Sequence, residues 1–428
     1  MRVETLTRSE LLEEVVACHR LGCGLEVCVY PKPGFAKKYA LLATRYGSND
    51  TRFRVNGEEA MTPAGIAHFL EHKLFEAEDG SIDDVFARQG AYSNAFTNYT
   101  TTAYLFSCTD GFETSLKTLV DFVFSPRFTY EGVEREKGII EQEIRMNQDQ
   151  PGWQVVSELI RSLFHFHPAR EDVAGTVESV RSIDVETLRK CYNTFYHPSN
   201  MTLFAIGDIS MQQVVDLVEQ EMERFRHGHA PVVERVRPDE PVTVARRQHS
   251  RKMMVSRPLV CMGYKDPDVG YDGERLARKV VTAEVLLSML VGRSSQLFSQ
   301  LYAEGIIDNS FSWDYSFDRD YAFVMFDGRT PDPQAFVDGL TWGFERFRTK
   351  GPDAEALERT RRFLMGTWLK EFNSLEAIAY QYLDYHFLGM NLFRRLEMAA
   401  AVTREEVMAM AENLLIEENK SVSMVLPA

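Results

Sequence analysis

The sequence repeats one series of predicted elements in its two halves, with a period of about 210 residues. Each half contains a helix, then two strands flanked by glycine, and then a long charged helix. In the first half these elements are predicted at 62–75, 91–109 and 131–149, and in the second at 280–302, 309–328 and 353–373. A repeat of this length predicts two homologous domains, because each copy contains enough elements to bury a core of its own.

An apolar strand ends each series, at Asn200–Asp208 and at Ser421–Ala428. Between the copies, residues 223–250 are rich in Arg, His, Pro and Glu and have few periodic apolar positions, which is typical of a linker. We therefore predict an N-terminal domain at 1–222 and a C-terminal domain at 251–428. Hairpin-like strands mixed with amphipathic helices predict the α+β class, each domain a largely antiparallel sheet with helices on one face.

Composition excludes several classes of function. The formal net charge is −15, whereas a nucleic-acid-binding surface needs clustered Lys and Arg, so no nucleic-acid partner is expected. No stretch reaches the ~18 apolar residues of a membrane-spanning helix, and the first residues carry acids instead of the apolar core of a signal peptide. Six cysteines contain no CxxC pair and are interpreted as buried or incidental thiols in a reducing compartment, not as a disulfide framework. These features predict a cytoplasmic protein that is not bound to a membrane.

The stretch His68-Phe-Leu-Glu-His72 carries the clearest chemistry. Thr62-Pro63 resembles a helix start, with a hydroxyl at the N-cap and proline at the first helical position. His68, Glu71 and His72 would then share one face of a helix at i, i+3 and i+4. Two imidazoles with this spacing can both reach one tetrahedral metal ion, and a carboxylate beside them can accept a proton from a water bound to it.

The predicted helix Glu131–Gln148 supplies a candidate third ligand. Glu136 and Glu143 lie on one stripe of that helix together with isoleucines, where an unpaired charge is costly. Salt bridges to neighbouring Arg or Lys are one explanation. The alternative makes Glu143 a direct metal ligand and Glu136 the group that orients a ligating imidazole. The ligand types suit zinc, and cobalt or manganese would leave the same pattern.

These motifs together resemble the pitrilysin family of zinc peptidases, which includes insulin-degrading enzyme and mitochondrial processing peptidase. The resemblance spans essentially the whole chain and is closest in look to the small bacterial processing peptidases. It rests on HFLEH, on the glutamate that ends VEREKGIIEQE, and on two further segments. Gly90–Thr97 followed by Thr102–Tyr104 is similar to the family's substrate-binding edge strand, and His167-Pro168 followed by Val173–Thr176 is similar to a structural turn.

The resemblance implies a zinc metallo-endopeptidase whose paired domains form a clamshell and which hydrolyses peptides or unfolded segments in a closed chamber. It implies one Zn²⁺ per chain, with His68, His72 and Glu143 as ligands. Glu71 would be the general base and Glu136 would support the site. The substrate would bind as an extra strand along Ala91–Thr97, and the residues expected to hold it are Asn94, Ala95, Phe96 and Thr97.

The chain departs from the family pattern in its second half. Many active relatives have an Arg and a nearby Tyr there, whereas this sequence offers Tyr302 and Asn309. Arg293, Tyr315 and Arg319 are close in sequence, with no basis for giving them that role. Thr360 and Thr367 stand where Glu136 and Glu143 stand in the first half, which predicts a metal-free second domain.

Two interpretations of this departure stay open: either catalysis is weak when the chain acts alone, or a partner subunit supplies the missing pair. A second subunit could complete the site, either as a homodimer or as a heterodimer in which this chain carries the zinc and a paralogue carries the missing pair. The alternative function is a non-catalytic structural subunit, like the core proteins of respiratory complexes that share the fold.

Overall fold

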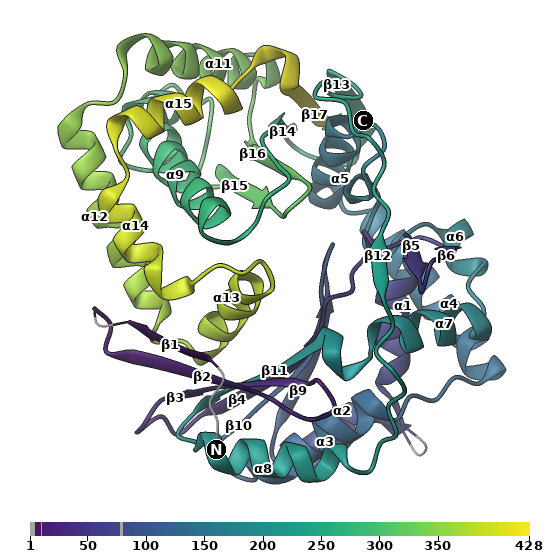
Figure 1. Cartoon of the computed structure of the whole chain (residues 1–428). Coiled ribbons are helices and arrows are strands. Elements are labelled where there is room, and N and C mark those ends of the chain that lie inside the picture. The colour runs from purple at the N-terminus through teal and green to yellow at the C-terminus, as the bar shows by residue number, and fades with distance from the viewer. Residues whose placement is uncertain (1–4, 10, 78–79) are drawn as a thin grey trace. The chain divides into compact units, whose positions relative to one another are not determined.

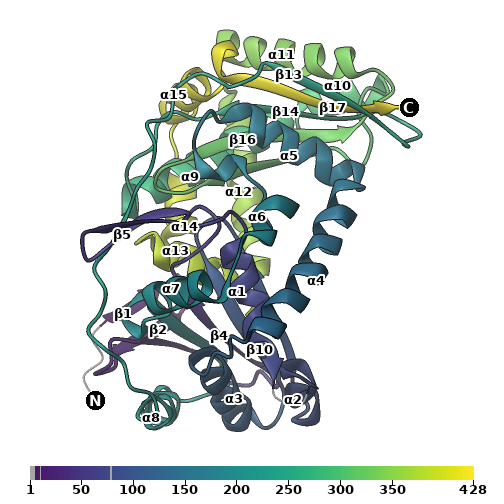
Figure 2. The same ribbon diagram turned by 90° about the vertical axis from the view of Figure 1, so that its right-hand side faces the viewer.

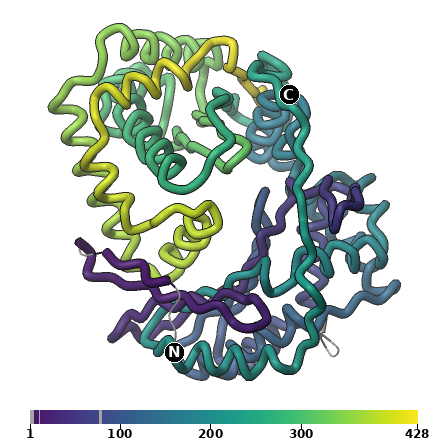
Figure 3. The backbone as a smooth tube through the Cα atoms, viewed as in Figure 1, coloured from purple at the N-terminus to yellow at the C-terminus, as the bar shows by residue number. Residues whose placement is uncertain are grey.

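The computed structural model describes residues 5–9, 11–77 and 80–428, and these divide into two compact units (Figure 1). The first unit consists of Met1–Arg145, Glu171–Arg237 and Phe372–Leu383. The second consists of Met146–Arg170, Pro238–Glu371 and Asp384–Ala428. The course of the chain through each unit can be followed in Figure 3. Each unit combines one large sheet of mostly antiparallel strands with packed helices, so the chain has the predicted α+β class.

The first unit is built on a seven-stranded sheet with the order β1-β2-β3-β11-β4-β10-β9. Only β3 and β11 are parallel. The strands are β1 (Thr5–Ser9), β2 (Glu14–Arg20), β3 (Glu26–Pro31), β4 (Lys38–Thr44), β9 (Tyr92–Thr97), β10 (Thr102–Cys108) and β11 (Met201–Gly207). All seven residues of β10 and of β11 are buried, because these strands lie inside the sheet and both of its faces are covered. Strand β9 forms one edge.

The second unit has a five-stranded sheet with the order β13-β17-β14-β16-β15. Its strands are β13 (Gln248–Met253), β14 (Leu259–Lys265), β15 (Ser312–Phe317), β16 (Ala322–Arg329) and β17 (Lys420–Pro427). Again one pair, β13 and β17, is parallel and the rest are antiparallel. This order matches β3-β11-β4-β10-β9 strand for strand, including the position of the parallel pair. The structure therefore confirms the duplication that the sequence predicts.

Helices of the first unit cover its sheet and hold the candidate site. They are α1 (Ile66–Leu74), α2 (Ile82–Arg88), α3 (Phe112–Phe124), α4 (Tyr130–Gln148, whose last residues belong to the second unit), α6 (Val177–Arg181), α7 (Val185–Phe195) and α8 (Met211–Met222). Figure 2 shows α1 beside the strands and the long helix α4. Helices α1, α2, α3 and α8 pack on the sheet, and one apolar cluster joins them to it. Small strands complete the unit: β5 (Arg52–Val55), β6 (Glu58–Met61), β7 (Glu76–Ala77), β8 (Gly80–Ser81) and β12 (Val233–Arg235).

The second unit contains the remaining helices. They are α5 (Pro151–Leu163), α9 (Gly273–Val291), α10 (Gln296–Ala303), α11 (Pro333–Lys350), α12 (Ala354–Glu371), α14 (Arg395–Ala401) and α15 (Arg404–Leu414), while α13 (Leu375–Phe387) begins in the first unit. The single helix predicted at 280–302 is two helices, α9 and α10, since the chain turns at Gly292–Ser295 between them.

The compact units are not the two contiguous halves of the chain. Helix α5 comes from the first half but packs on β14 and β17 of the second unit, where Leu159 lies against Gly263. In return, Phe372–Leu383 from the second half belongs to the first unit, where Tyr382 stacks on Phe204 with ring centroids 4.5 Å apart. Helix α5 and Phe372–Leu383 each cover one face of a sheet, and the other helices of that unit cover the opposite face. Both faces of each sheet therefore bury apolar surface.

The predicted linker is partly strand. Val233–Arg235 forms β12, which pairs with β5 of the first unit, and β13 begins at Gln248 and pairs with β17 of the second. One of the points where the chain passes between the units falls at Arg237 and Pro238, inside the predicted range 223–250. A stretch that lacks apolar periodicity can still add an edge strand, because main-chain hydrogen bonds do not depend on the side chains.

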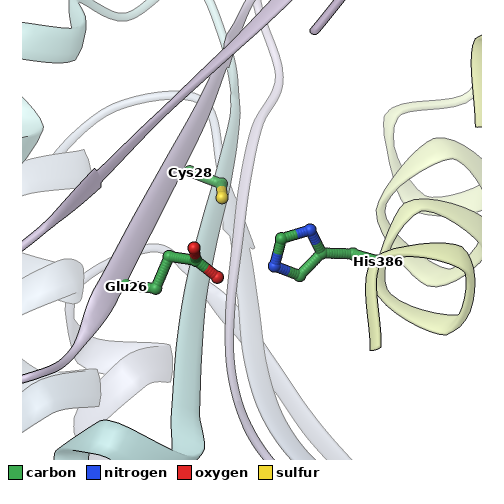
Figure 4. Close-up of side chains that lie close together, drawn as sticks. All are labelled: Glu26, Cys28 and His386. Carbon is green, nitrogen blue, oxygen red and sulfur yellow. The ribbon is translucent and has the colours of Figure 1, made fainter. Parts of the chain in front are cut away.

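The prediction that the cysteines form no disulfide is wrong for one pair. Cys18 on β2 and Cys28 on β3 are bonded to each other, while Cys23, Cys108, Cys191 and Cys261 are free. The two bonded residues face each other directly in the register of the antiparallel strands, a pairing that sequence spacing does not reveal. Figure 4 shows Cys28 with Glu26 on β3. The disulfide removes one of the grounds for predicting a reducing compartment.

No helix in the described part of the chain combines the length and the apolar character needed to cross a membrane.

Candidate metal centre

Helix α1 carries the HFLEH stretch, but it begins later than predicted. Its first residue is Ile66 and its N-cap is Gly65, so the predicted start at Thr62-Pro63 is wrong. The N–H of Thr62 donates to the carbonyl of Thr51 at 2.8 Å, which holds this residue in an extended segment after β6. Gly65 then turns the chain into the helix with a φ of +88°, a conformation that glycine adopts without strain.

Two glycines let a second segment pack against the start of α1. A Cβ added at Gly65 would lie 2.3 Å from the carbonyl oxygen of Ala174, and one added at Gly175 would lie 2.5 Å from that of Ala64. The hydroxyl of Ser179 donates to the carbonyl of Ala64 at 2.8 Å. The turn at Val173–Thr176 therefore fixes the position of the helix end that lies one turn before His68.

Replacing Gly65 with alanine is expected to lower the free energy of unfolding by at least about 2 kcal/mol, because the left-handed conformation and the backbone clash both disfavour a Cβ. Gly138→Ala is the matched control, since a Cβ there meets nothing within 4 Å inside helix α4. It should instead stabilise the protein by up to about 1 kcal/mol. Urea denaturation of both variants measures the difference, and equal stabilities would contradict the close packing.

The residues predicted to bind metal come together in the first unit. His68 and His72 on α1 meet Glu143 on α4, and one ligand atom from each lies within 4.8 Å of the others. His68 Nε2 is 3.7 Å from Glu143 Oε1, and His72 Nε2 is 3.5 Å from Glu143 Oε2. The two imidazole rings are edge to face with centroids 4.6 Å apart. Helices α1 and α4, which are distant in sequence, thus bring two imidazole nitrogens and one carboxylate close together.

This donor set fits a zinc ion. Ligands about 2.0–2.2 Å from a tetrahedral zinc are roughly 3.3–3.6 Å from one another, close to the two nitrogen–oxygen distances found here. In the described part of the chain, Glu143 pairs with the two histidines instead of with Arg or Lys. The salt-bridge explanation for Glu143 therefore has no support, and three ligands leave a fourth position open.

Glu136 orients one of the two imidazoles. Its Oε1 lies 2.9 Å from Nδ1 of His72, and Glu136 as a whole is buried. A hydrogen on Nδ1 that is donated to this carboxylate leaves the lone pair on Nε2, the nitrogen that faces Glu143. On one stripe of α4, Glu143 thus lies at the cluster of ligand atoms and Glu136 lies behind His72.

The electrostatics of the cluster keep one imidazole neutral. Burial, together with the positive charge of His72, lowers the pKa of His68 to about 3, so His68 is neutral at physiological pH. For His72, burial alone would lower the pKa, but the hydrogen bond and charge of Glu136, with the charges of Glu71 and Glu143, raise it. Burial also raises the pKa of Glu71 and of Glu143. A carboxylate with a raised pKa is a better proton acceptor near neutral pH.

Glu136→Gln is expected to weaken zinc binding by about 10- to 100-fold, because the amide holds the His72 ring less firmly than a carboxylate does. Glu134→Gln on the same helix is the matched control, since Glu134 pairs with Lys137 at the surface and not with a histidine. Competition with a chromophoric chelator measures both affinities. Equal affinities in the two variants would show that Glu136 has no part in metal binding.

The predicted substrate strand is an exposed edge. Among the described residues, strand β9 pairs only with β10, so no strand of that part of the chain bonds its other side. Asn94 is exposed, and its Oδ1 accepts the N–H of Ala95 at 2.9 Å. Phe96 packs on Tyr380 with ring centroids 4.9 Å apart, and the hydroxyl of Thr97 donates to Glu71. An edge of this kind can accept an extended peptide through main-chain hydrogen bonds.

A cavity of about 810 Å³ connects the edge strand with the cluster. Its lining includes Glu71, His72 and Glu136 from the two helices and Asn94 and Ala95 from β9. Apolar walls are added by Phe75 and Ile139. The cavity is large enough for one side chain of a bound peptide or more, and it places that peptide beside the glutamate predicted to be the base.

The second-half candidates do not belong to this cluster. Tyr302 is 46% exposed at the end of α10, and Asn309 lies in the turn after it, both in the second unit. Tyr315 and Arg319 have other partners there: Tyr315 donates to Asp266 at 2.7 Å, and Arg319 pairs with Asp272 at 3.1 Å.

Helix α12 places Thr360 and Thr367 at the positions of the two glutamates of α4, and Thr367 donates to the carbonyl of Phe363 in its own helix. Within the described residues, no group of three His, Cys, Asp or Glu with metal-binding spacing lies wholly in the second unit. The second unit thus repeats the fold of the first without its ligands.

One functional contact was not predicted. The sequence suggests Thr97 as a substrate-binding residue of the edge strand, whereas its side chain contacts Glu71. No local signal indicates this contact, because the two residues meet only when β9 packs beside α1.

A duplicated α+β unit whose first copy alone carries the HFLEH helix defines a class of two-domain zinc peptidases. The family model "Insulinase (Peptidase family M16)" matches residues 57–177, and the model "Peptidase M16 inactive domain" matches residues 182–364. The chain is 39% identical to the "Uncharacterized zinc protease YmfH" of Bacillus subtilis (strain 168) over 420 residues, which are 98% of each sequence. The chain belongs to the insulinase family, peptidase family M16.

Solved structures agree with this membership. An M16-like peptidase from Alicyclobacillus acidocaldarius superposes with a TM-score of 0.94 and 36% identity, covering 97% of this chain and 99% of the other. Pitrilysin superposes with a TM-score of 0.75 and 16% identity over 99% of this chain and 46% of its own, which shows a shared fold. The resemblance drawn from HFLEH and its companion motifs is thereby confirmed at the level of the family.

Proposed function

We propose that this chain is a zinc-dependent endopeptidase that hydrolyses peptides or unfolded segments bound as an added strand along β9. One observation carries the proposal. The ligand atoms of His68, His72 and Glu143 converge within 4.8 Å, while Glu71, on the same helix face, lines a cavity shared with the edge strand. Metal ligands, a proton acceptor and a peptide-binding edge are the parts that a metallopeptidase needs.

The residues divide the chemistry between them. His68, His72 and Glu143 would hold one zinc ion, which when bound polarises the scissile carbonyl and lowers the pKa of a coordinated water towards 7. Glu71 accepts a proton from the attacking water and can later donate it to the departing amine. Glu136 keeps the His72 imidazole in the tautomer that offers Nε2 to the ion.

Substrate recognition would depend mainly on the peptide main chain. Strand β9 offers a free edge, and Asn94 Oδ1 must release the N–H of Ala95 if that amide is to bond a substrate carbonyl. Main-chain hydrogen bonds do not depend on the substrate's side chains, so selectivity for peptide sequence would be low. The cavity beside Phe75 and Ile139 would supply what selectivity there is.

A second subunit would complete the site. The second unit offers Tyr302 and Asn309 where many active relatives have an Arg and a Tyr, and it has no ligand cluster of its own among the described residues. We propose a dimer. We favour a paralogous partner, which would supply the missing Arg and Tyr, over a second copy of this chain. Full activity of a homodimer without a paralogue would contradict the heterodimer.

A cytoplasmic location remains part of the proposal. The four thiols of Cys23, Cys108, Cys191 and Cys261 are free, as expected in a reducing compartment, whereas the Cys18–Cys28 disulfide is more typical of an oxidising one. Fractionation of cells that produce the native chain tests it, and recovery of the protein outside the cytoplasm would contradict it.

Cleavage of a quenched fluorescent peptide library by the purified, zinc-loaded chain tests the proposed function. Cleavage that stops on chelation and returns with zinc is the expected result, and the products identify the bonds that are cut. Zinc binding without cleavage would indicate that a partner subunit is missing. If adding a paralogue then restores no cleavage, a non-catalytic structural subunit would be favoured. Absence of both zinc and cleavage would contradict the proposal.

A further inference from the structure

A threonine on the edge strand makes a hydrogen bond with the predicted general base. Thr97 Oγ1 lies 2.6 Å from Oε2 of Glu71, and both side chains are partly buried. Within the described residues this is the hydrogen bond that the Glu71 carboxylate makes. The other carboxylate oxygen, Oε1, is left for the chemistry of the site.

The direction of this hydrogen bond follows from the groups involved. An ionised carboxylate can only accept, so Thr97 must donate its single hydroxyl hydrogen to Glu71. Thr102 lies directly opposite Thr97 in the register of β9 and β10, and its hydroxyl donates to the carbonyl of Tyr46 at 2.9 Å. The two threonine oxygens are 3.3 Å apart, but both hydroxyl hydrogens are donated elsewhere, so the buried Thr102 is a packing neighbour of Thr97 and does not compete for its hydrogen.

The hairpin that carries Thr97 is held firmly at its tip. Asn98 donates its N–H to the carbonyl of Thr101 at 2.8 Å, and Asn98 Oδ1 accepts the N–H groups of Thr100 and Thr101. The tip also packs on the segment after β4, where a Cβ at Gly47 would lie 2.4 Å from the nitrogen of Thr100. Backbone contacts therefore fix Thr97, and its branched side chain has few rotamers to choose from.

We propose that Thr97 is a positioning residue for Glu71, which it holds in the one orientation that directs Oε1 towards the attacking water. This inference rests on the proposed function, since it assumes that Glu71 is the base. A glutamate has three rotatable side-chain bonds, and fixing them before substrate binds removes an entropy cost from the reaction. Bases in hydrolases are commonly oriented by a third group in this way.

Two substitutions separate this role from substrate binding and from simple packing. Thr97→Val keeps the shape of the side chain and removes the hydroxyl, whereas Thr97→Ser keeps the hydroxyl and removes a methyl group. For Thr97→Val we expect kcat for peptide hydrolysis to fall about 10- to 100-fold, with KM within about twofold and one zinc still bound per chain. Thr97→Ser should stay within about threefold of the wild-type kcat.

A wild-type kcat in Thr97→Val would overturn the inference, and so would an equal loss in Thr97→Ser, since packing would then explain both. A rise in KM with an unchanged kcat in Thr97→Val would also overturn it, because Thr97 would then act only in substrate binding.

Crystal structures of the zinc-loaded wild type and of both variants give a second measurement that needs no activity. The Glu71 carboxylate is expected to leave its position or to become disordered in Thr97→Val and to stay in place in Thr97→Ser. An unmoved carboxylate in Thr97→Val overturns the positioning role even if the wild type proves inactive. Failure of the proposed function alone would appear differently, as an inactive wild type with a carboxylate that still depends on Thr97.

Discussion

Glu71→Gln is expected to lower kcat for peptide hydrolysis by about 10²- to 10⁴-fold while one zinc ion remains bound. The substitution removes the proton acceptor and its charge but keeps the shape of the side chain, since glutamine has the size of glutamate and its carbonyl can still accept the hydroxyl of Thr97. The ligand atoms of His68, His72 and Glu143 are untouched. Initial rates on one fluorescent peptide, with zinc content measured on the same samples, give the comparison.

Glu134→Gln is the control for this prediction, because it neutralises a glutamate of the same unit that pairs with Lys137 at the surface. It should keep the wild-type rate. Hydrolysis by Glu71→Gln at the wild-type rate would show that another group takes the proton, and the assignment of Glu71 as the base would have to be abandoned.

Removal of one ligand should have an equally large effect, on the metal itself. Glu143→Ala is expected to weaken zinc binding by a factor on the order of 10³ or more and to abolish hydrolysis, since only two imidazoles would remain for the ion. Isothermal titration of the metal-free protein with zinc measures the change. His68 is neutral and ready to bind, because burial lowers its pKa to about 3, so the loss would reflect the missing carboxylate.

Glu141→Ala, two positions earlier on α4, is the matched control. Glu141 accepts two hydrogen bonds from Arg181 at the surface, at 2.7 and 2.8 Å, and does not reach the histidines. Its removal should leave zinc affinity unchanged. If both variants bound zinc as the wild type does, Glu143 would not be a ligand.

The sequence indicates which side chains of the candidate site come together, because these residues recur at the short spacings of a helix. The positions of His68, Glu71 and His72 follow from helical spacing, and Glu136 and Glu143 follow from one stripe of a charged helix. The duplication was also visible, since each copy repeats the same order of elements, and the structure adds that even the parallel strand pair recurs. Patterns that depend on neighbours a few residues apart are the ones that a sequence displays.

Features that depend on distant segments were not predictable in this way. The N-cap of α1 is Gly65 instead of the predicted Thr62, and this depends on the backbone of Ala174, far along the chain. The Cys18–Cys28 disulfide depends on the register of two strands, and the contact of Thr97 with Glu71 depends on how a sheet edge packs beside a helix.

The exchange of α5 and Phe372–Leu383 between the units has the same origin. An amphipathic helix shows that it covers an apolar surface, but its own residues do not specify which of two similar sheets it covers.

Anomalous X-ray diffraction at the zinc edge, from crystals of the chain loaded with one equivalent of zinc, tests the central claim most directly. The account predicts one strong peak about 2.0–2.2 Å from Nε2 of His68, Nε2 of His72 and a carboxylate oxygen of Glu143. A peak at another site, or no peak at this one, would contradict it.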